Sequence, residues 1–292
     1  MRKISGAGLG LCLALFLTWF AFSARPKAQT PVAQAARTPV LVELFTSEGC
    51  SSCPPADALL RKLTAQQPIA GAEIIGLEEH VDYWNHDGWA DPYSSPEWTE
   101  RQQDYVTLLK QDAYTPEFVV DGQKQFVGND SRQAQAEIEK AASSVKTEVT
   151  LSAAKPDGNG SQRFSVSVGK LAGGRADDSA EVWLAITEDG LHSAVSRGEN
   201  AGRVLQHVAT LRLLHKIGTA NVNGGSASFT GDTLVKFNPR WNPEKLHVVA
   251  FVQEKKSRKV LGAASSTVRD KMESQASPPP PTDAEETEQK KM

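Results

Sequence analysis

The spacing of apolar and polar residues divides the chain into a part that mixes strands with helices and a later part that is mostly strand. A run rich in Val and Leu, such as residues 39–46, is typical of a buried strand, whereas Leu59, Leu60 and Leu63 recur at helical spacing. The first part is therefore expected to hold a strand over 39–46, a helix over 56–67, a strand over 72–77, a helix over 96–111, a hairpin over 118–127 and a helix over 131–143.

Beyond about residue 146 the pattern becomes a strand-like alternation that glycine-containing breaks interrupt. Strands are expected over 147–153, 163–168, 180–187, 226–229 and 246–253. Residues 203–217 fit either a pair of strands or a helix. The pattern predicts a mostly antiparallel, β-sandwich-like domain over 146–270.

The two ends of the chain have compositions typical of targeting and linker segments. Arg2 and Lys3 precede a long uncharged stretch rich in Leu, Ala and Phe, which predicts a signal peptide or signal anchor over 1–28. Residues 29–38 are a predicted linker, and the tail 271–292 is predicted to be disordered. Either form of the N-terminal segment places the rest of the chain in the periplasm or outside the cell, and the uncleaved form would anchor it in the inner membrane.

The charge balance argues against one class of partner. The chain has 32 Lys and Arg against 35 Asp and Glu, a net charge of −3, and a pI near 6.1. It contains no basic stripe with interleaved aromatic residues. Binding to nucleic acid is therefore not expected. At 292 residues the chain is long enough for two domains with cores of their own.

Cys50-Ser51-Ser52-Cys53 is the strongest chemical motif in the sequence. Of the three cysteines, Cys12 lies in the apolar N-terminal stretch, so the exported part keeps only this pair. A structural disulfide is expected to join distant segments, because its stabilisation grows with the loop that it closes. A C-x-x-C pair between a strand and a helix is instead typical of reversible thiol–disulfide exchange.

The two cysteines are expected to have different roles in exchange. At the amino end of a helix, free backbone N–H groups and the helix dipole would lower the pKa of the attacking Cys50 from about 8.5 to roughly 4–7. Cys53, one turn further on, would be more buried and would resolve the mixed disulfide. Pro54 and Pro55 are tolerated only in the first turn of a helix, which places the helix start here. The Cys50–Cys53 couple would then need no separate cofactor.

Two further features are candidate parts of the same site. A cis peptide bond at Thr115-Pro116 would place the Thr115 backbone beside the cysteines, ready to pair with an extended substrate; the alternative is a trans bond at a strand start. Glu43 is the lone carboxylate in the apolar run 40–45. Buried behind the disulfide, it would have a raised pKa and relay protons to Cys53; the alternative is an exposed residue on an edge strand.

The order strand, CxxC, helix, strand, insertion, Thr-Pro, hairpin, helix resembles the thioredoxin fold over residues 39–145. Several stretches are similar to the exported thioredoxin-like family catalogued as domain of unknown function 1223. They are VELFTSEGCSSCPPAD at 42–57, HVDYW at 80–84, Gly88-Trp89, Asp91-Pro92, Tyr114-Thr115-Pro116 and GENAGR at 198–203. The resemblance implies an α/β thioredoxin-like domain over 39–145, followed by the mostly antiparallel β-sandwich-like domain. It implies the reaction only by analogy.

Three functions from different classes follow from these features. The first is an exported thiol–disulfide oxidoreductase whose partner is a protein thiol or disulfide in the cell envelope. The second is a chaperone for copper or another soft metal that uses Cys50, Cys53, His80 and His86. The third is a binding module without catalysis, in which the cysteine pair is a relict. Arg203, His207 and His215 have no spacing that implies catalysis.

Overall fold

The structure is a computed structural model that describes residues 37–175, 178–220 and 227–268. The predicted signal segment, most of the predicted linker and the predicted tail lie outside these residues. Among the described residues, no helix has the length and apolar character needed to cross a bilayer.

The first half of the described chain alternates strands and helices, as its hydrophobic pattern predicts. The elements are β1 (Thr38–Thr46), α1 (Pro54–Gln66), β2 (Ala72–His80), α2 (Pro96–Leu109), β3 (Glu117–Val120), β4 (Lys124–Val127) and α3 (Ser131–Ala142). Strand β1 pairs in parallel with β2 and antiparallel with β3, which continues into β4 through a hairpin. Helix α1 begins at Pro54, where proline fits the first helical turn.

The second half consists almost entirely of strands. They are β5 (Val149–Ala153), β6 (Ser161–Gly169), β7 (Ala180–Glu188), β8 (Leu191–Ala194), β9 (Val204–His207), β10 (Thr210–Ala220), β11 (Ala227–Lys236), β12 (Leu246–Glu254) and β13 (Val260–Thr267), with the 3-10 helix η1 (Pro243–Lys245) before β12. Residues 203–217 contain β9 and much of β10, so this stretch is strand and not helix, although β9 pairs with β8 and β10 pairs with β7 and β2.

The predicted fold class, an α/β thioredoxin-like domain followed by a β-sandwich-like domain, is wrong. Strand is the most frequent regular structure among the described residues, and the main sheet is a mixed one of eight strands in the order β13-β12-β7-β10-β2-β1-β3-β4. Strands of both halves are neighbours in it because Thr210 of β10 pairs in parallel with Glu78 of β2. Local periodicity reports the type of each element, but it does not report which strands meet at a sheet edge. The domain boundary near residue 146 stays a prediction.

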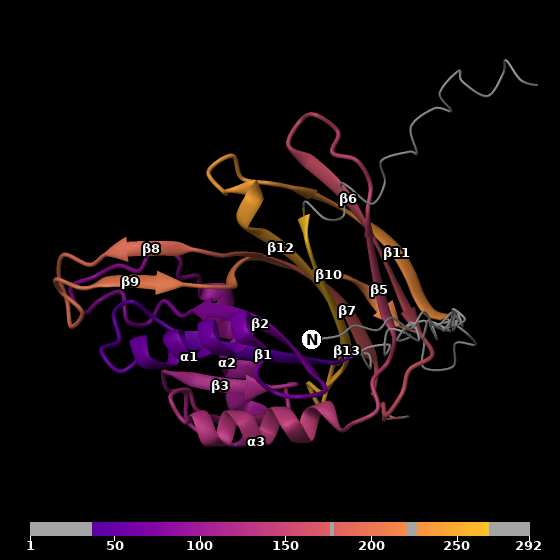
Figure 1. Cartoon of the computed structure of the whole chain (residues 1–292), viewed down its shortest axis with the longest axis horizontal. Helices are drawn as coiled ribbons and strands as arrows, with labels where there is room; N and C mark the ends of the chain where they lie inside the picture. The colour runs from indigo at the N-terminus through magenta and orange to yellow at the C-terminus, as the bar shows by residue number, and fades with distance from the viewer. Residues whose placement is uncertain (1–36, 176–177, 221–226, 269–292) are drawn as a thin grey trace, which may run out of the picture. The chain divides into compact units, whose positions relative to one another are not determined.

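The layers on the main sheet follow from the alternation of side chains along β1. Val40, Val42 and Leu44 face α1 and α3, whereas Leu41 and Phe45 face the opposite side, where α2 packs. Further along the sheet, the three strands β11-β6-β5 form a second sheet, whose apolar residues share a core with β7, β10 and β12 (Figure 1). The CSSC turn therefore follows β1 at the carboxyl end of two buried parallel strands.

Strands β8 and β9 form a separate two-stranded hairpin that lies over α1 (Figure 1). Arg61 of α1 donates a hydrogen bond of 2.9 Å from Nη1 to the backbone oxygen of Gln206 in β9. The tip of this hairpin, residues 195–203, returns to the carboxyl end of β1. Because β9 is followed almost at once by β10, the hairpin is tied to the main sheet at its base.

The turn between β3 and β4 contacts the loop between β12 and β13, and so joins the first half of the described chain to the second. Asp121 and Gly122 both have positive φ, as a tight Asp-Gly hairpin turn requires, and this turn was predicted from the sequence. Val260 donates its backbone N–H to the Asp121 oxygen at 2.9 Å. A Cβ on Gly122 would lie only 1.9 Å from the backbone oxygen of Arg258, so a side chain there would collide with the β12–β13 loop.

We expect Gly122→Ala to lower the free energy of unfolding by about 3 kcal/mol or more, because backbone strain of about 1–2 kcal/mol adds to overpacking of about 1–3 kcal/mol. Gly71→Ala is the matched control, since Gly71 also has positive φ but has no atom within 4 Å of its Cβ position. That control should lose only about 1–2 kcal/mol. Urea denaturation of both variants measures the difference, and equal losses would show that this turn does not join the halves.

Candidate functional site

Cys50 and Cys53 form a disulfide in the turn that joins β1 to α1. The turn is closed by two backbone hydrogen bonds of 3.2 Å, from Cys50 N to Ser47 O and from Cys53 N to Cys50 O. Cys53 is the N-cap residue of α1, and Cys50 lies three residues before it. The cysteines therefore stand where a strand ends and a helix begins, the place that the sequence predicted for them.

The tip of the β8–β9 hairpin covers this turn. The side chain of Asn200 is fully buried, and its Nδ2 donates to the backbone oxygens of Glu48 at 2.8 Å and of Cys50 at 2.9 Å. The backbone N–H of Ser51 donates to Glu199 Oε2 at 3.0 Å. Cys50 is 1% exposed and Cys53 is 0% exposed, so the disulfide is shielded from solvent in this arrangement.

Trp84 supports the turn from another direction and explains the glycine before the first cysteine. A Cβ on Gly49 would lie 2.9 Å from the Cβ of Trp84, closer than packed carbon atoms come. Trp84 in turn donates from Nε1 to Thr115 Oγ1 at 2.8 Å. A chain of contacts therefore runs from the CSSC turn through Trp84 to Thr115.

The Thr115–Pro116 peptide bond is cis, as the sequence analysis considered. Pro116 lies beside the first turn of α1, with Gly128 between them: a Cβ on Gly128 would be 3.1 Å from the Cβ atoms of both Pro116 and Ala56. The structure thus brings Thr115 and Pro116 to the region of the cysteines.

Glu43 is buried, but it faces the other side of the sheet. Its carboxylate accepts hydrogen bonds of 2.6 Å from Arg101 Nε and from the Tyr105 hydroxyl, both on α2. Burial, and next the charge of Glu43, raises the pKa of the neighbouring Glu79 well above its usual range. The structure therefore places Glu43 in a polar cluster under α2 and does not bring it to the α1 side, where Cys53 caps the helix.

Asp57 is the buried carboxyl group on the α1 side. It lies one helical turn after Cys53, and its backbone N–H donates to the Cys53 oxygen at 3.2 Å. Its Oδ1 accepts a hydrogen bond of 2.6 Å from Thr46 Oγ1. Burial, and next the charge of Glu78, raises the pKa of Asp57 to about 7. Asp57 can therefore gain or lose a proton near neutral pH beside the CSSC turn.

Two buried histidines meet Glu78 beyond Asp57. His80 Nε2 lies 3.4 Å from Glu78 Oε2, and His207 Nδ1 lies 3.3 Å from Glu78 Oε1. The other ring nitrogen of each histidine faces a second carboxylate: His80 Nδ1 is 2.7 Å from Asp91 Oδ2, and His207 Nε2 is 2.9 Å from Glu48 Oε1. The two rings lie edge to face with their centroids 4.6 Å apart.

The neighbours of these groups shift their pKa values against the effect of burial. Burial alone would raise the pKa of Glu78, but His207 and His80 lower it to about 2. Burial alone would lower the pKa of His207, but Glu78 and Glu48 raise it to about 9. Asp91 and Glu78 likewise hold the pKa of His80 well above its usual range. In this structure the histidine–carboxylate contacts therefore oppose the effect of burial on these groups.

His80 is part of this cluster, but His86 is exposed and lies outside it. Within the described part of the chain, the group of side chains able to converge on one metal ion is Glu78, His80 and His207, without either cysteine. The sequence analysis did not select Asp57, although it follows Cys53 by one helical turn. His207 had no local signal, because it lies 129 residues from Glu78 along the chain.

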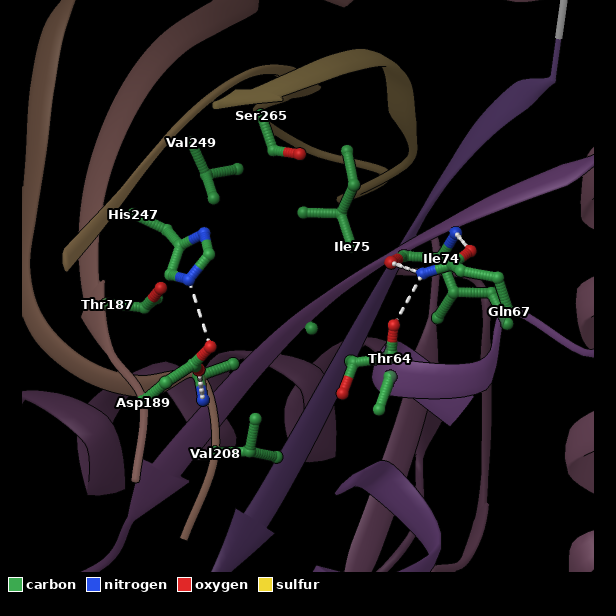
Figure 2. A pocket seen from close by; sticks show the side chains of 13 residues that line it. Thr64, Gln67, Ile74, Ile75, Thr187, Asp189, Val208, His247, Val249 and Ser265 are labelled. Carbon is green, nitrogen blue, oxygen red and sulfur yellow. Dashed lines mark hydrogen bonds and ion pairs between the residues drawn. The ribbon is translucent and has the colours of Figure 1, made fainter. Parts of the chain in front are cut away.

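A cavity of about 250 Å³ opens at the far end of α1 (Figure 2). Figure 2 shows that His247 points toward Asp189 on one wall, with 2.9 Å between Nε2 and Oδ2. On the other wall, Gln67 bonds the backbone of Ile74. A helix of 13 residues is about 20 Å long, so this cavity is well separated from the disulfide.

Comparisons with known proteins identify a family and solved structures with a similar fold. Residues 41–253 match the model of a family described as "Protein of unknown function (DUF1223)". The chain is similar to the crystal structure of protein AGR_C_4864 from Agrobacterium tumefaciens, with 25% sequence identity and a TM-score of 0.58, covering 80% of this chain and 95% of that one. It shares its fold with HBP35 of Porphyromonas gingivalis, with 12% identity and a TM-score of 0.56, covering 86% and 81% of the two chains. No curated protein matches the chain.

We expect Asp57→Asn to change how stability depends on pH. Because the folded-state pKa of Asp57 is raised from 3.8 to about 7, the folded protein holds this proton more tightly than the unfolded chain does. The stability contribution of the protonated carboxyl is complete below about pH 4 and is lost as pH rises to about 7. The amide has no proton to lose, so the variant should gain up to about 4 kcal/mol relative to the parent between pH 4 and pH 8.

Urea denaturation at several pH values measures this gain. Asp232→Asn, which changes an exposed carboxylate on β11, is the matched control and should stay parallel to the parent protein. Parallel pH curves for Asp57→Asn and the parent would contradict the assignment.

Proposed function

The chain belongs to the DUF1223 family, and we propose that it is an exported thiol–disulfide oxidoreductase whose reactive couple is Cys50–Cys53. The observation that carries the proposal is the disulfide itself, which closes a four-residue turn between a buried parallel strand and the start of a helix. Such a short link constrains the unfolded chain very little, so a purely stabilising role is weakly supported. The periplasm or the cell exterior, where disulfides persist, is the compartment that suits it.

The proposed reaction is a pair of thiol–disulfide exchanges. A substrate thiolate attacks Cys50 Sγ; a mixed disulfide forms, the Cys50–Cys53 bond breaks, and Cys53 leaves as a thiolate. A second substrate thiolate then attacks the mixed disulfide, so that the substrate is oxidised by two electrons and the Cys50–Cys53 couple is reduced to two thiols. A second dithiol–disulfide protein restores the couple, and with a reducing partner every step runs in reverse.

Asp57 is the proposed proton carrier of this reaction, in place of Glu43. It lies one helical turn after Cys53, and its pKa of about 7 lets it donate a proton to the departing Cys53 thiolate and recover the proton later. Glu43 is bound by Arg101 and Tyr105 on the opposite face of the sheet. The role therefore goes to the carboxyl group on the same side of the sheet as α1.

Access to Cys50 requires the hairpin tip to move. The disulfide is buried, and Asn200 and Glu199 of the tip bond the turn that contains it. Displacement of the tip would also expose the turn edge next to Thr115 and Pro116, where an extended substrate backbone is proposed to lie. The hairpin is then a cover that a protein partner displaces when it binds.

We expect Cys50→Ser to abolish disulfide exchange on a reduced model peptide, because the disulfide that the substrate thiolate attacks is missing. Cys53→Ser should instead accumulate a mixed disulfide with the oxidised, disulfide-bonded form of the peptide, because the Cys50 thiolate attacks that disulfide, one peptide thiol leaves, and no resolving thiol remains. Non-reducing gel electrophoresis and mass spectrometry detect the trapped species. Ser52→Ala keeps both sulfurs and should retain exchange. Unchanged exchange by Cys50→Ser would remove the proposed function.

We expect Asn200→Ala to speed reduction of the disulfide by glutathione about tenfold. Two hydrogen bonds are lost, each with a net contribution of about 0.5–1.5 kcal/mol, so the tip leaves the turn more often. Alkylation of free thiols at timed intervals measures the rate. Glu199→Gln is the control, because its amide oxygen still accepts from Ser51 N–H. Equal rates for Asn200→Ala and the parent would show that the tip does not limit access.

A further inference from the structure

We propose that Glu78, His80 and His207 form a site for one divalent transition-metal ion of the zinc class, between β2 and the base of the β8–β9 hairpin. Each residue offers one ligand atom, and these atoms all lie within 4.8 Å of one another. Two imidazole nitrogens and one carboxylate oxygen are a set of ligands that zinc accepts in sites with an open fourth position. Neither cysteine takes part, so this site is separate from the thiol chemistry.

An unpartnered nitrogen points to a missing ligand. His80 is fully buried, and its Nε2 has no hydrogen-bond partner. Buried polar side-chain atoms nearly always have such a partner, because leaving one unpaired costs free energy. Its ion-pair partner, Glu78 Oε2, is 3.4 Å away, longer than an ordinary hydrogen bond. A metal ion bound by both residues would satisfy this nitrogen.

In each histidine, the ring nitrogen that faces away from Glu78 (the outer nitrogen) contacts another carboxylate, as in many metal centres. His80 Nδ1 faces Asp91 at 2.7 Å, and His207 Nε2 faces Glu48 at 2.9 Å. A histidine that binds a metal almost always gives its other N–H to a carboxylate or a carbonyl, which fixes the tautomer and the ring orientation. With those contacts holding the outer nitrogens, loss of the inner protons when a metal ion binds would leave lone pairs on His80 Nε2 and His207 Nδ1 directed toward Glu78.

The inner nitrogens lie at distances from the Glu78 carboxylate that a shared ion would also allow. His207 Nδ1 is 3.3 Å from Oε1, in a long hydrogen bond, and His80 Nε2 is 3.4 Å from the other oxygen, Oε2. Metal–ligand bonds of about 2.0–2.2 Å in a tetrahedral arrangement place neighbouring ligand atoms about 3.4 Å apart. The carboxylate is also oriented in advance, because Thr210 Oγ1 donates to Glu78 Oε2 at 2.8 Å.

The hairpin provides a route by which an ion reaches the site. A cavity of about 270 Å³ lies beside the hairpin, and its lining includes His207, His192 and Arg61. His207 therefore connects the buried cluster to a space that an ion can enter. A bound ion would join β9, which carries His207, to β2, which carries Glu78 and His80.

The test is a titration of the oxidised, chelator-stripped protein with Zn²⁺ by calorimetry, and with Co²⁺ by visible absorption spectroscopy. We expect one equivalent of each ion to bind, Zn²⁺ to raise the melting temperature, and the Co²⁺ spectrum to lack a thiolate charge-transfer band. Glu78→Gln and His207→Gln should each weaken binding about 100-fold or more. His247→Gln is the matched control, because His247 is also paired with a carboxylate but lies outside the cluster, and it should bind as the parent does.

Circular dichroism of each metal-free variant confirms that it is folded. If a histidine variant does not fold, the Co²⁺ spectra of the parent protein before and after reduction of the disulfide still decide between nitrogen–oxygen ligands and sulfur ligands, because only sulfur ligands would change the spectrum on reduction. No binding by the parent, or undiminished binding by both Glu78→Gln and His207→Gln, would overturn the proposal. The Cys50→Ser, Cys53→Ser double variant should keep full binding.

The proposed oxidoreductase function and the proposed metal site can be refuted independently of each other. The metal titration uses protein in which the disulfide is intact, whereas the exchange assay is run with a chelator present. If the protein binds the metal ion but does not carry out disulfide exchange, the oxidoreductase proposal is wrong and the metal-site proposal stands. If the protein carries out disulfide exchange but does not bind the metal ion, the metal-site proposal is wrong and the oxidoreductase proposal stands.

Discussion

The pairing of β10 with β2 is the constraint on which the rest of the site depends. Thr210 and Glu78 are parallel partners, the Glu78 N–H donates to the Ala209 oxygen at 2.9 Å, and the Thr210 hydroxyl donates to the Glu78 carboxylate at 2.8 Å. Since β9 ends at His207, only three residues earlier, this pairing fixes that histidine above the end of β2. It also ties the base of the hairpin whose tip covers the disulfide. Without this pairing the second half of the chain would supply neither the His207 imidazole ring nor the hairpin tip that covers the disulfide.

Buried charges are concentrated on both faces of β1 and β2, and their cost explains how tightly they are bonded. Under α2, Glu43 is bound by Arg101 and Tyr105, and Glu79, whose pKa is raised by burial well above the usual range, lies 3.6 Å from Arg101 Nε in a longer ion pair. Under α1, Glu78 is held between two histidines and a threonine. Desolvating an ion costs several kcal/mol even after relaxation, so apolar residues would be cheaper at these positions. A reaction at the carboxyl ends of the parallel strands would be a physical reason for ionisable residues at these buried positions.

The first half of the fold was accessible from the sequence because its signals are local. Leu59, Leu60 and Leu63 specify α1, Pro54 marks its start, and Asp121-Gly122 marks the hairpin. The fold class was predicted wrongly because strand pairing over long separations leaves no periodic trace, and β10 reaches β2 across 132 residues between Thr210 and Glu78. The same limit applies to the site. Cys50, Cys53 and Pro116 lie in recognisable motifs, whereas His207 becomes meaningful only through its contact with Glu78. Successive side chains of β1 point to opposite faces of the sheet, and one carboxylate in an apolar run does not show which face it occupies, so the position of Glu43 could not be predicted.

The β8–β9 hairpin connects two features that otherwise lie on different elements. Its tip bonds the CSSC turn through Asn200 and Glu199, and its last residue, His207, lies between Glu48 and Glu78. Glu48 belongs to the same turn as Cys50, and its backbone oxygen is a further acceptor for Asn200. The hairpin, the turn and the end of β2 therefore form a closed ring of contacts. Displacing the tip to uncover Cys50, as the proposed function requires, would strain the contacts of His207 with Glu48 and Glu78 at the other end of the hairpin. The hairpin is therefore the element through which the buried cluster and the disulfide would influence each other.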